Sequence, residues 1–231
     1  MEFSLLGAVA VAVVAVRIVL RLEAGRGNAA DCTGDLWDGL LTAGIVGLAV
    51  GRVAAMLLDG TNPVTHLGDL VIVRGGVDTA AASLSAVAVL GWRLRSDLWW
   101  MLDAAAPAAV AGLAGWHAGC LVRESACLGT PSSLPWAIGQ AGSSVTRHPV
   151  EIYAALLLGL AAAALALWKR YRRPRPGVLA GAAIAVAGLA RLVTEPMRPS
   201  LGSTPAWLYG AAAIVGLGVT ALRAASTPAS R

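Results

Sequence analysis

The chain has 231 residues, of which 57% are hydrophobic and only 13% are charged. A soluble domain needs more charge on its surface, so this composition excludes an ordinary soluble fold and indicates that lipid surrounds most of the chain. The formal net charge is +5. Basic loops beside an anionic membrane surface account for that charge without a nucleic-acid partner.

Apolar stretches that can cross a bilayer recur along the chain. The hydrocarbon core is about 30 Å thick, which a helix of about 20 apolar residues spans. We expect residues 1–231 to form a single membrane domain, an all-α integral membrane bundle of about seven transmembrane helices. The predicted spans are residues 2–20, 39–58, 77–92, 99–122, 149–168, 177–195 and 205–222.

The basic residues predict the orientation of these spans. Of the 18 Lys and Arg residues, three lie within spans, eleven in one set of alternate loops with the C-terminal tail, and four in the other set. Short cytoplasmic loops carry the excess of positive charge. We therefore expect the N-terminus outside, the C-terminus in the cytoplasm, and residues 123–148 in an external loop.

Span two combines small residues with a charge. Gly44, Gly47 and Gly51 recur at helical spacing, which predicts close packing of this helix against a neighbour. Arg52 follows directly. A charge within a span is a candidate functional residue, and two interpretations are open: the side chain snorkels to the interface, or it points into the bundle.

Span four contains Asp103, for which we expect a solvated or capping role near the start of its helix. Cys120 and Cys127 follow; with Cys32 they make an odd count of three. This count predicts no disulfide framework, although an oxidising compartment would permit a bond between Cys120 and Cys127. The long loop after them is rich in Gly, Ser and Pro, and we expect it to be ordered at the membrane face.

Residues 147–153, Arg-His-Pro-Val-Glu-Ile-Tyr, open span five. Pro149 is tolerated in a first helical turn, and the helix dipole favours Glu151 there. His148 and Tyr153 are either capping and interface residues or part of a site at the mouth of the helix.

Arg191 and Glu195 lie four residues apart in span six, on one helix face, where they can pair. Two interpretations are open here as well. The two side chains neutralise each other, or Glu195 holds Arg191 in place for an anion such as a lipid phosphate.

Several stretches resemble the prolipoprotein diacylglyceryl transferases of bacteria. Residues 147–153 resemble the family's His-Pro-x-Gln-x-Tyr, and residues 129–136, Gly-Thr-Pro-Ser-Ser-Leu-Pro-Trp, resemble its Gly-Arg-Pro-Thr-Asp-Leu-Pro-Trp. Gly51-Arg52 resembles a Gly-Ala-Arg step, residues 74–76 lie where a Gly-Gly pair precedes the family's His-Gly-Gly, and Arg191-x-x-x-Glu195 matches its late Arg and Glu. The resemblance covers residues 38–200.

Members of that family transfer the diacylglyceryl group of phosphatidylglycerol to the lipobox cysteine of a prolipoprotein, which forms a thioether and releases glycerol phosphate. The resemblance implies no metal and no cofactor, and it implies three partners in the bacterial cytoplasmic membrane: phosphatidylglycerol, the prolipoprotein signal peptide and membrane lipid. It implies that Arg191 binds the phosphate, that Glu195 orients Arg191, and that His148 and Tyr153 shape the mouth of the site. The further substrate-binding positions it implies are Arg52, Gly129, Arg147 and Glu151.

The chain departs from the family at two motifs. The family's Gly-Arg-x-Gly-Asn-Phe-x-Asn-Gly-Glu is poorly kept at residues 115–129; aligned on Gly119-Cys120, the chain has His117 in place of the Arg and Cys120 in place of the Asn. Arg123 and Glu124 are candidates to replace the missing charges. Residues 79–82, Thr-Ala-Ala-Ala, stand where the family has its His-Gly-Gly. We therefore expect His117 to act as the proton acceptor or as a phosphate contact.

Three functions fit these residues. The first is the transferase reaction. The second is a catalytically degenerate relative that binds anionic phospholipid or escorts lipoproteins, for which Arg191 and Glu195 suffice. The third, a small transporter or channel, is disfavoured because the sequence has no internal repeat. Convergence of His117 and Arg191 on one site would favour the first.

Overall fold

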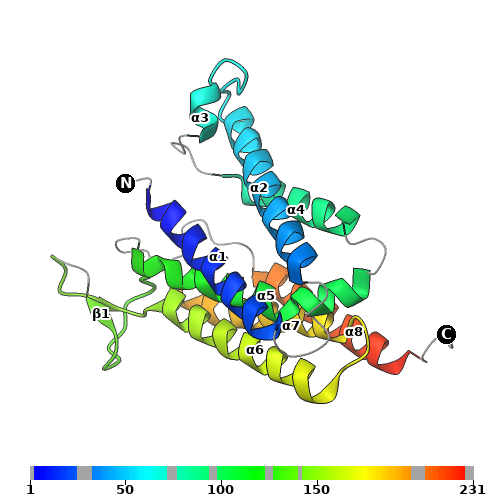
Figure 1. Ribbon diagram of the computed structural model, residues 1–231. Helices are drawn as coiled ribbons and strands as arrows, with labels where there is room; N and C mark the ends of the chain where they lie inside the picture. The colour runs from blue at the N-terminus through cyan, green and yellow to red at the C-terminus, as the bar shows by residue number, and fades with distance from the viewer. Residues whose placement is uncertain are drawn as a thin grey trace. The chain divides into compact units, whose positions relative to one another are not determined.

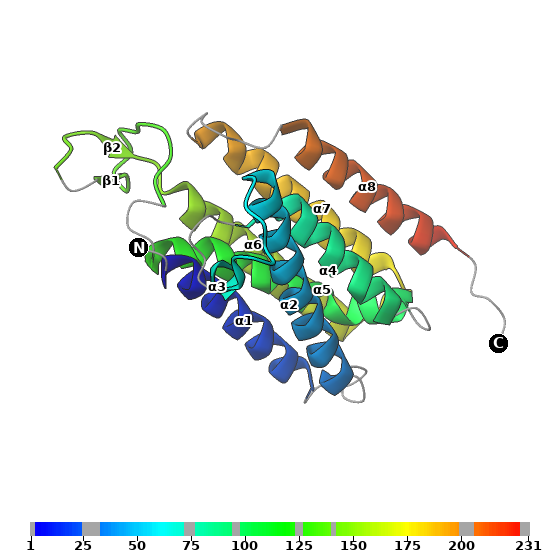
Figure 2. The same ribbon diagram turned by 90° about the horizontal axis from the view of Figure 1, so that it is seen from above.

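A computed structural model describes residues 3–24, 33–71, 77–93, 98–122, 127–139, 142–198 and 206–226, and it is mostly helical (Figures 1 and 2). The helices are α1 (Phe3–Ala24), α2 (Thr33–Leu58), α3 (Leu67–Val71), α4 (Thr79–Arg93), α5 (Leu98–Ala118), α6 (Val150–Arg172), α7 (Val178–Thr194) and α8 (Ala206–Ala225). Short 3-10 turns follow α5 at Gly119–Val122 and α7 at Glu195–Met197. Each predicted apolar stretch coincides with a helix, and α3 is additional.

Five helices in the described part of the chain are long and apolar enough to cross a membrane. They are Leu36–Leu58, Leu98–Val122, Val150–Arg172, Val178–Met197 and Ala206–Ala225. Ala80–Arg93 is a shorter apolar helix. Many large apolar side chains on these helices are exposed, such as Leu160 and Ile214. Such side chains are suited to contact with lipid rather than water.

The helices form two compact units. One contains α1 and the chain from Leu102 onward, and the other contains α2, α3 and α4. The expectation of a single membrane domain over residues 1–231 stays a prediction.

The core of the first unit lies where α5, α6 and α7 meet. Its buried side chains are small or aliphatic, among them Val110, Leu158 and Leu179. Small residues also bring α1 against α5, since a Cβ added to Gly115 would lie only 2.8 Å from the Cα of Ala12. Helices in lipid gain stability from such close approach because no hydrophobic force drives them together.

Close approach at small residues also joins α7 to α8, which run side by side in both views (Figures 1 and 2). A Cβ on Gly188 would lie 2.7 Å from the backbone N of Ala213, and a Cβ on Gly216 would lie 2.3 Å from the backbone N of Ala185. Glycine at these positions lets the two backbones touch. This packing sets the place of the residues at the end of α7.

Asp103 of α5 is buried, and its carboxylate accepts hydrogen bonds from the backbone N–H groups of Gly177 (2.8 Å) and Ala180 (2.7 Å). The acid therefore caps the start of α7, not the start of its own helix as the sequence suggested. Nearby, Lys169 of α6 donates to Glu23 of α1 (2.9 Å). These contacts fasten one end of the first unit.

In the second unit α2 packs along α4. A Cβ on Gly47 would lie 2.9 Å from the carbonyl oxygen of Ala82, and one on Gly51 would lie 2.6 Å from Val77. At Gly44, no atom of a described neighbour lies within 4 Å of such a Cβ. The predicted close packing of span two is thus confirmed at Gly47 and Gly51 and is wrong at Gly44.

The long loop folds into a hairpin before α6. Strands β1 (Ile138–Gly139) and β2 (Thr146–Arg147) pair antiparallel, with Ile138 opposite Arg147. This short sheet is absent from the all-α prediction, because two-residue strands leave no alternating pattern in a sequence. A disulfide joins Cys120 to Cys127 at the start of the loop, so the bond that the sequence left open is present.

Candidate active site

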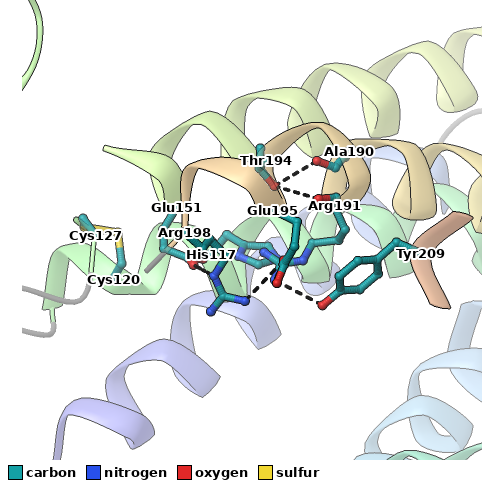
Figure 3. A network of polar contacts seen from close by, with 10 residues as sticks. All are labelled: His117, Cys120, Cys127, Glu151, Ala190, Arg191, Thr194, Glu195, Arg198 and Tyr209. Atoms are coloured by element: carbon teal, nitrogen blue, oxygen red, sulfur yellow. Dashed lines mark hydrogen bonds and ion pairs between the residues drawn. A yellow bond between two sulfur atoms is a disulfide. The ribbon is translucent and has the colours of Figure 1, made fainter. Parts of the chain in front are cut away.

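A chain of charged side chains lies at the ends of α5, α6 and α7 (Figure 3). His117 comes from the last turn of α5 and Glu151 from the first turn of α6. Arg191 and Glu195 come from the end of α7, and Arg198 follows the 3-10 turn after it. All of these residues belong to the first unit.

His117 and Glu151 make the closest contact. The imidazole Nδ1 lies 2.5 Å from Oε2 of Glu151, and the other carboxylate oxygen, Oε1, lies 3.3 Å from Nε of Arg198. His117 is 8% exposed. Glu151 stands in the first turn of α6 as predicted, but its carboxylate also joins two cationic or basic partners that lie far from it in sequence.

Arg191 and Glu195 pair as the i, i+4 spacing predicted, with Nη2 of the guanidinium 3.3 Å from Oε2 of the carboxylate. The same Nη2 donates to the hydroxyl of Tyr209 on α8 (3.4 Å), and the guanidinium lies over that ring, 5.2 Å from its centroid. Arg198 Nη1 lies 3.6 Å from Oε2 of Glu195. Ion pairs therefore link His117 to Arg191 through three intervening side chains.

The end of α7 is shaped by its own sequence. Thr194 is buried, and its hydroxyl donates to the backbone carbonyls of Ala190 (2.9 Å) and Arg191 (3.3 Å). Pro196 follows within the 3-10 turn. Because proline cannot continue the helical hydrogen bonding, the chain turns here and brings Arg198 beside Glu195.

Three buried polar atoms of the described residues have no hydrogen-bond partner there. They are Nη1 of Arg191, Oε1 of Glu195 and Nδ1 of His148. Buried polar groups in proteins are almost always paired, so each such atom needs an explanation. A guanidinium N–H left unpaired beside a carboxylate can bind an anionic oxygen of a ligand.

The loop before α6 is held in this region by hydrogen bonds to backbone carbonyl groups. Gly129 donates to the carbonyl of His148 (2.7 Å), and Arg147 Nη1 donates to the carbonyl of Gly129 (3.1 Å). A Cβ on Gly129 would lie 2.2 Å from the carbonyl oxygen of Met197. Glycine is therefore needed where the loop meets the turn after α7, and a contact of Gly129 with substrate stays a prediction.

Aromatic side chains stand beside this loop. The indole N–H of Trp136 donates to the hydroxyl of Tyr153 (2.7 Å), and the rings of His148 and Tyr153 meet edge to face at 6.2 Å. Trp136 is 58% exposed. His148 and Tyr153 thus lie together near the start of α6, and their roles in a reaction stay predictions.

Not all predicted residues join this cluster. Arg52 belongs to the other compact unit, where it is buried and donates from Nε to the carbonyl of Asp69 (3.0 Å). This burial favours the interpretation in which Arg52 points inward over the one in which it snorkels. Arg123 and Glu124, the proposed replacements for missing charges, and residues 74–76 lie outside the described residues.

Sequence reasoning missed Arg198 and Tyr209. Arg198 follows Arg191 by seven residues and Glu195 by three, a spacing that continues one face of a helix, and this was the available signal. Tyr209 carried no such signal, because only the packing of α8 on α7 brings it to Arg191.

Together, the fold and this site define a helical membrane protein with a partly buried cluster of arginines, carboxylates and a histidine. The chain belongs to the prolipoprotein diacylglyceryl transferase family, whose model matches residues 3–226. The recognition made from short motifs is thereby confirmed.

Curated relatives agree with the family. A phosphatidylglycerol–prolipoprotein diacylglyceryl transferase of Polaromonas sp. (strain JS666 / ATCC BAA-500) is 31% identical, with 84% of this chain and 78% of the relative aligned. One of Polynucleobacter necessarius subsp. necessarius (strain STIR1) is 30% identical over 78% of this chain and 71% of the relative. One of Ruegeria pomeroyi is 41% identical, but over only 30% of this chain and 28% of the relative.

Proposed function

We propose that this protein transfers the diacylglyceryl group of phosphatidylglycerol to the lipobox cysteine of a prolipoprotein. Family membership over nearly the whole chain supports the reaction. The names of the relatives supply its two substrates. The observation that carries the proposal is the partly buried guanidinium of Arg191, whose buried nitrogen Nη1 has no hydrogen-bond partner among the described residues.

Arg191 is the phosphate-binding residue in this proposal. Its Nη2 is engaged by Glu195 and Tyr209, while Nη1 remains available for a phosphate oxygen. The lipid phosphate is a diester with one negative charge, and the released glycerol phosphate gains another. A fixed guanidinium in a site of low dielectric stabilises that added charge in the transition state.

The other site residues have proposed roles around the phosphate. Glu195 orients Arg191, and His117 serves as the proton acceptor for the thiol or as a second phosphate contact. His148 and Tyr153 shape the mouth where lipid and peptide meet. The remaining proposed substrate contacts are Arg52, Gly129, Arg147 and Glu151.

We also propose how the chain lies in the membrane. Seven spans cross the bacterial cytoplasmic membrane, with the N-terminus outside and the C-terminus in the cytoplasm. The excess of Lys and Arg in one set of loops supports this orientation. It places the ends of α5 and α7 that carry His117 and Arg191 toward the outer side.

Thioether formation tests the proposal directly. The purified protein in detergent is mixed with phosphatidylglycerol and a lipobox peptide, and the peptide mass is measured. We expect a diacylglyceryl mass shift in the wild type, its loss in Arg191→Ala, and no change in Arg172→Ala. Arg172 is a suitable control because it is an exposed arginine at the far end of α6.

Binding of phosphatidylglycerol separates the two main functions. If the wild type binds this lipid, Arg191→Ala does not, and no mass shift forms, the protein is the lipid-binding relative and the transferase proposal fails. Size-exclusion profiles of the variants confirm that the loss is not one of folding.

A further inference from the structure

The contact between His117 and Glu151 is shorter than the other ion pairs of the described residues, at 2.5 Å against 2.9 Å or more. We propose that the two residues form an acid–base dyad, in which His117 takes the proton of the lipobox thiol and Glu151 is its positioning residue. The inference rests on the proposed transferase function. Of the two roles open for His117, proton acceptor and phosphate contact, it selects the proton acceptor.

The hydrogen bond determines which ring nitrogen can act as the base. An ionised carboxylate only accepts hydrogen bonds, so the proton in the contact belongs to Nδ1 of His117. A neutral imidazole carries one N–H, and Nε2 therefore keeps its lone pair. Nε2 makes no hydrogen bond within the described part of the chain. A nitrogen with a lone pair accepts a thiol proton, and it cannot donate to a phosphate oxygen.

Glu151 is itself held from its other side. Its Oε1 lies 3.3 Å from Nε of Arg198, and Arg198 reaches on to Glu195 at 3.6 Å. The carboxylate plane is therefore fixed between an imidazole and a guanidinium. A base whose ring is oriented in this way needs little rearrangement when the thiol arrives.

The charges balance through the proposed step. With neutral His117, the linked side chains comprise two guanidinium groups and two carboxylates. The thiol proton moves to Nε2, the thiolate sulfur forms a bond to the glyceryl carbon, and the bond from that carbon to the phosphate oxygen breaks. The imidazolium gains one positive charge while the departing phosphate gains one negative charge. The proton then passes to that phosphate or to water.

The alternative is a purely structural role, in which the ion pair stabilises the packing of α5 against α6. Two lipobox peptides separate the possibilities, one with cysteine and one with selenocysteine, because a selenol is ionised near neutral pH and needs no base. The variants are His117→Gln, Glu151→Gln and the two combined, and His66→Gln is the control. His66 is exposed, and its ring lies within hydrogen-bond distance of Thr65 and Asn62 in its own loop.

We expect His117→Gln to slow transfer to the thiol by about 10²- to 10⁴-fold, the usual contribution of a general base. With the selenol peptide the loss should shrink to about tenfold or less, and that activity shows that the variant is folded. Glu151→Gln should lower the rate on the thiol and leave the rate on the selenol much less affected, because only the thiol needs the oriented base. The combined variant should lose little more than His117→Gln, because residues that act as a unit are not additive.

Equal losses on thiol and selenol would overturn the dyad, since a structural pair serves both nucleophiles alike. So would additive losses in the combined variant. Absence of product from the wild type with both peptides would refute the transferase function itself, and the inference with it.

Discussion

Contact between α7 and α8 should hold the site together, and Gly216→Ala tests this. The added Cβ would lie 2.3 Å from the backbone N of Ala185 and 2.7 Å from the carbonyl of Gly181, where ordinary contact begins at 3.4 Å. Both neighbours are backbone atoms that cannot rotate away, so the helices must separate by about 1 Å. Overpacking of this kind costs about 1–3 kcal/mol.

Separation of α7 from α8 should also slow the proposed reaction. Tyr209 on α8 accepts a hydrogen bond from Arg191 at 3.4 Å, already near the limit for such a bond. A shift of about 1 Å would break it and loosen the guanidinium that we propose binds phosphate. We expect a lower midpoint of thermal unfolding in detergent and slower thioether formation.

Gly218→Ala is the matched control on the same helix. No atom of another described residue lies within 4 Å of its added Cβ, and alanine favours a helix over glycine by about 0.5–1 kcal/mol. Its unfolding midpoint should stay the same or rise. Equal midpoints for the two variants would refute the argument that backbone contact at Gly216 positions α8.

Three further changes address other contacts. Asp103→Ala should destabilise the protein by about 1–2 kcal/mol because it removes the acceptor that caps α7. Asp103→Asn keeps one acceptor oxygen and should therefore destabilise it less. Thermal unfolding measures both variants. Arg191→Lys keeps the charge but loses the planar pair of donors, so a titration should show phosphatidylglycerol bound about 10- to 100-fold more weakly; unchanged affinity would contradict a role for Nη1. Reduction of the bond between Cys120 and Cys127, seven residues apart, should lower stability by about 2–3 kcal/mol. Cys120→Ser should show the same loss and no further response to reductant.

Local signals in the sequence were sufficient for the helices and for one part of the site. Apolar runs locate helices because lipid requires every backbone group to be bonded within its own segment. The pairing of Arg191 with Glu195 follows from helical geometry alone, since residues four apart share a face. The start of α6 at Val150 follows from Pro149 and the acid in its first turn.

Contacts between distant parts of the chain were not predictable in this way. Asp103 and Gly177 are 74 residues apart, and His117 and Glu151 are 34 apart. Nothing in the residues near Asp103 indicates that it caps another helix. Gly44 and Gly47 have the same local spacing, yet only Gly47 meets a neighbouring backbone.

The sequence by itself determined that this is a helical membrane protein of the diacylglyceryl transferase family, because composition, apolar length and short motifs are local properties. Only the tertiary structure decided which charges meet. The imidazole of His117, the carboxylate of Glu151 and the guanidinium of Arg198 come together because α5, α6 and α7 pack through small residues. Removing charged groups from water costs free energy, and a protein tolerates this cost only when each charge has a partner. The packing of the helices determines which side chains become those partners.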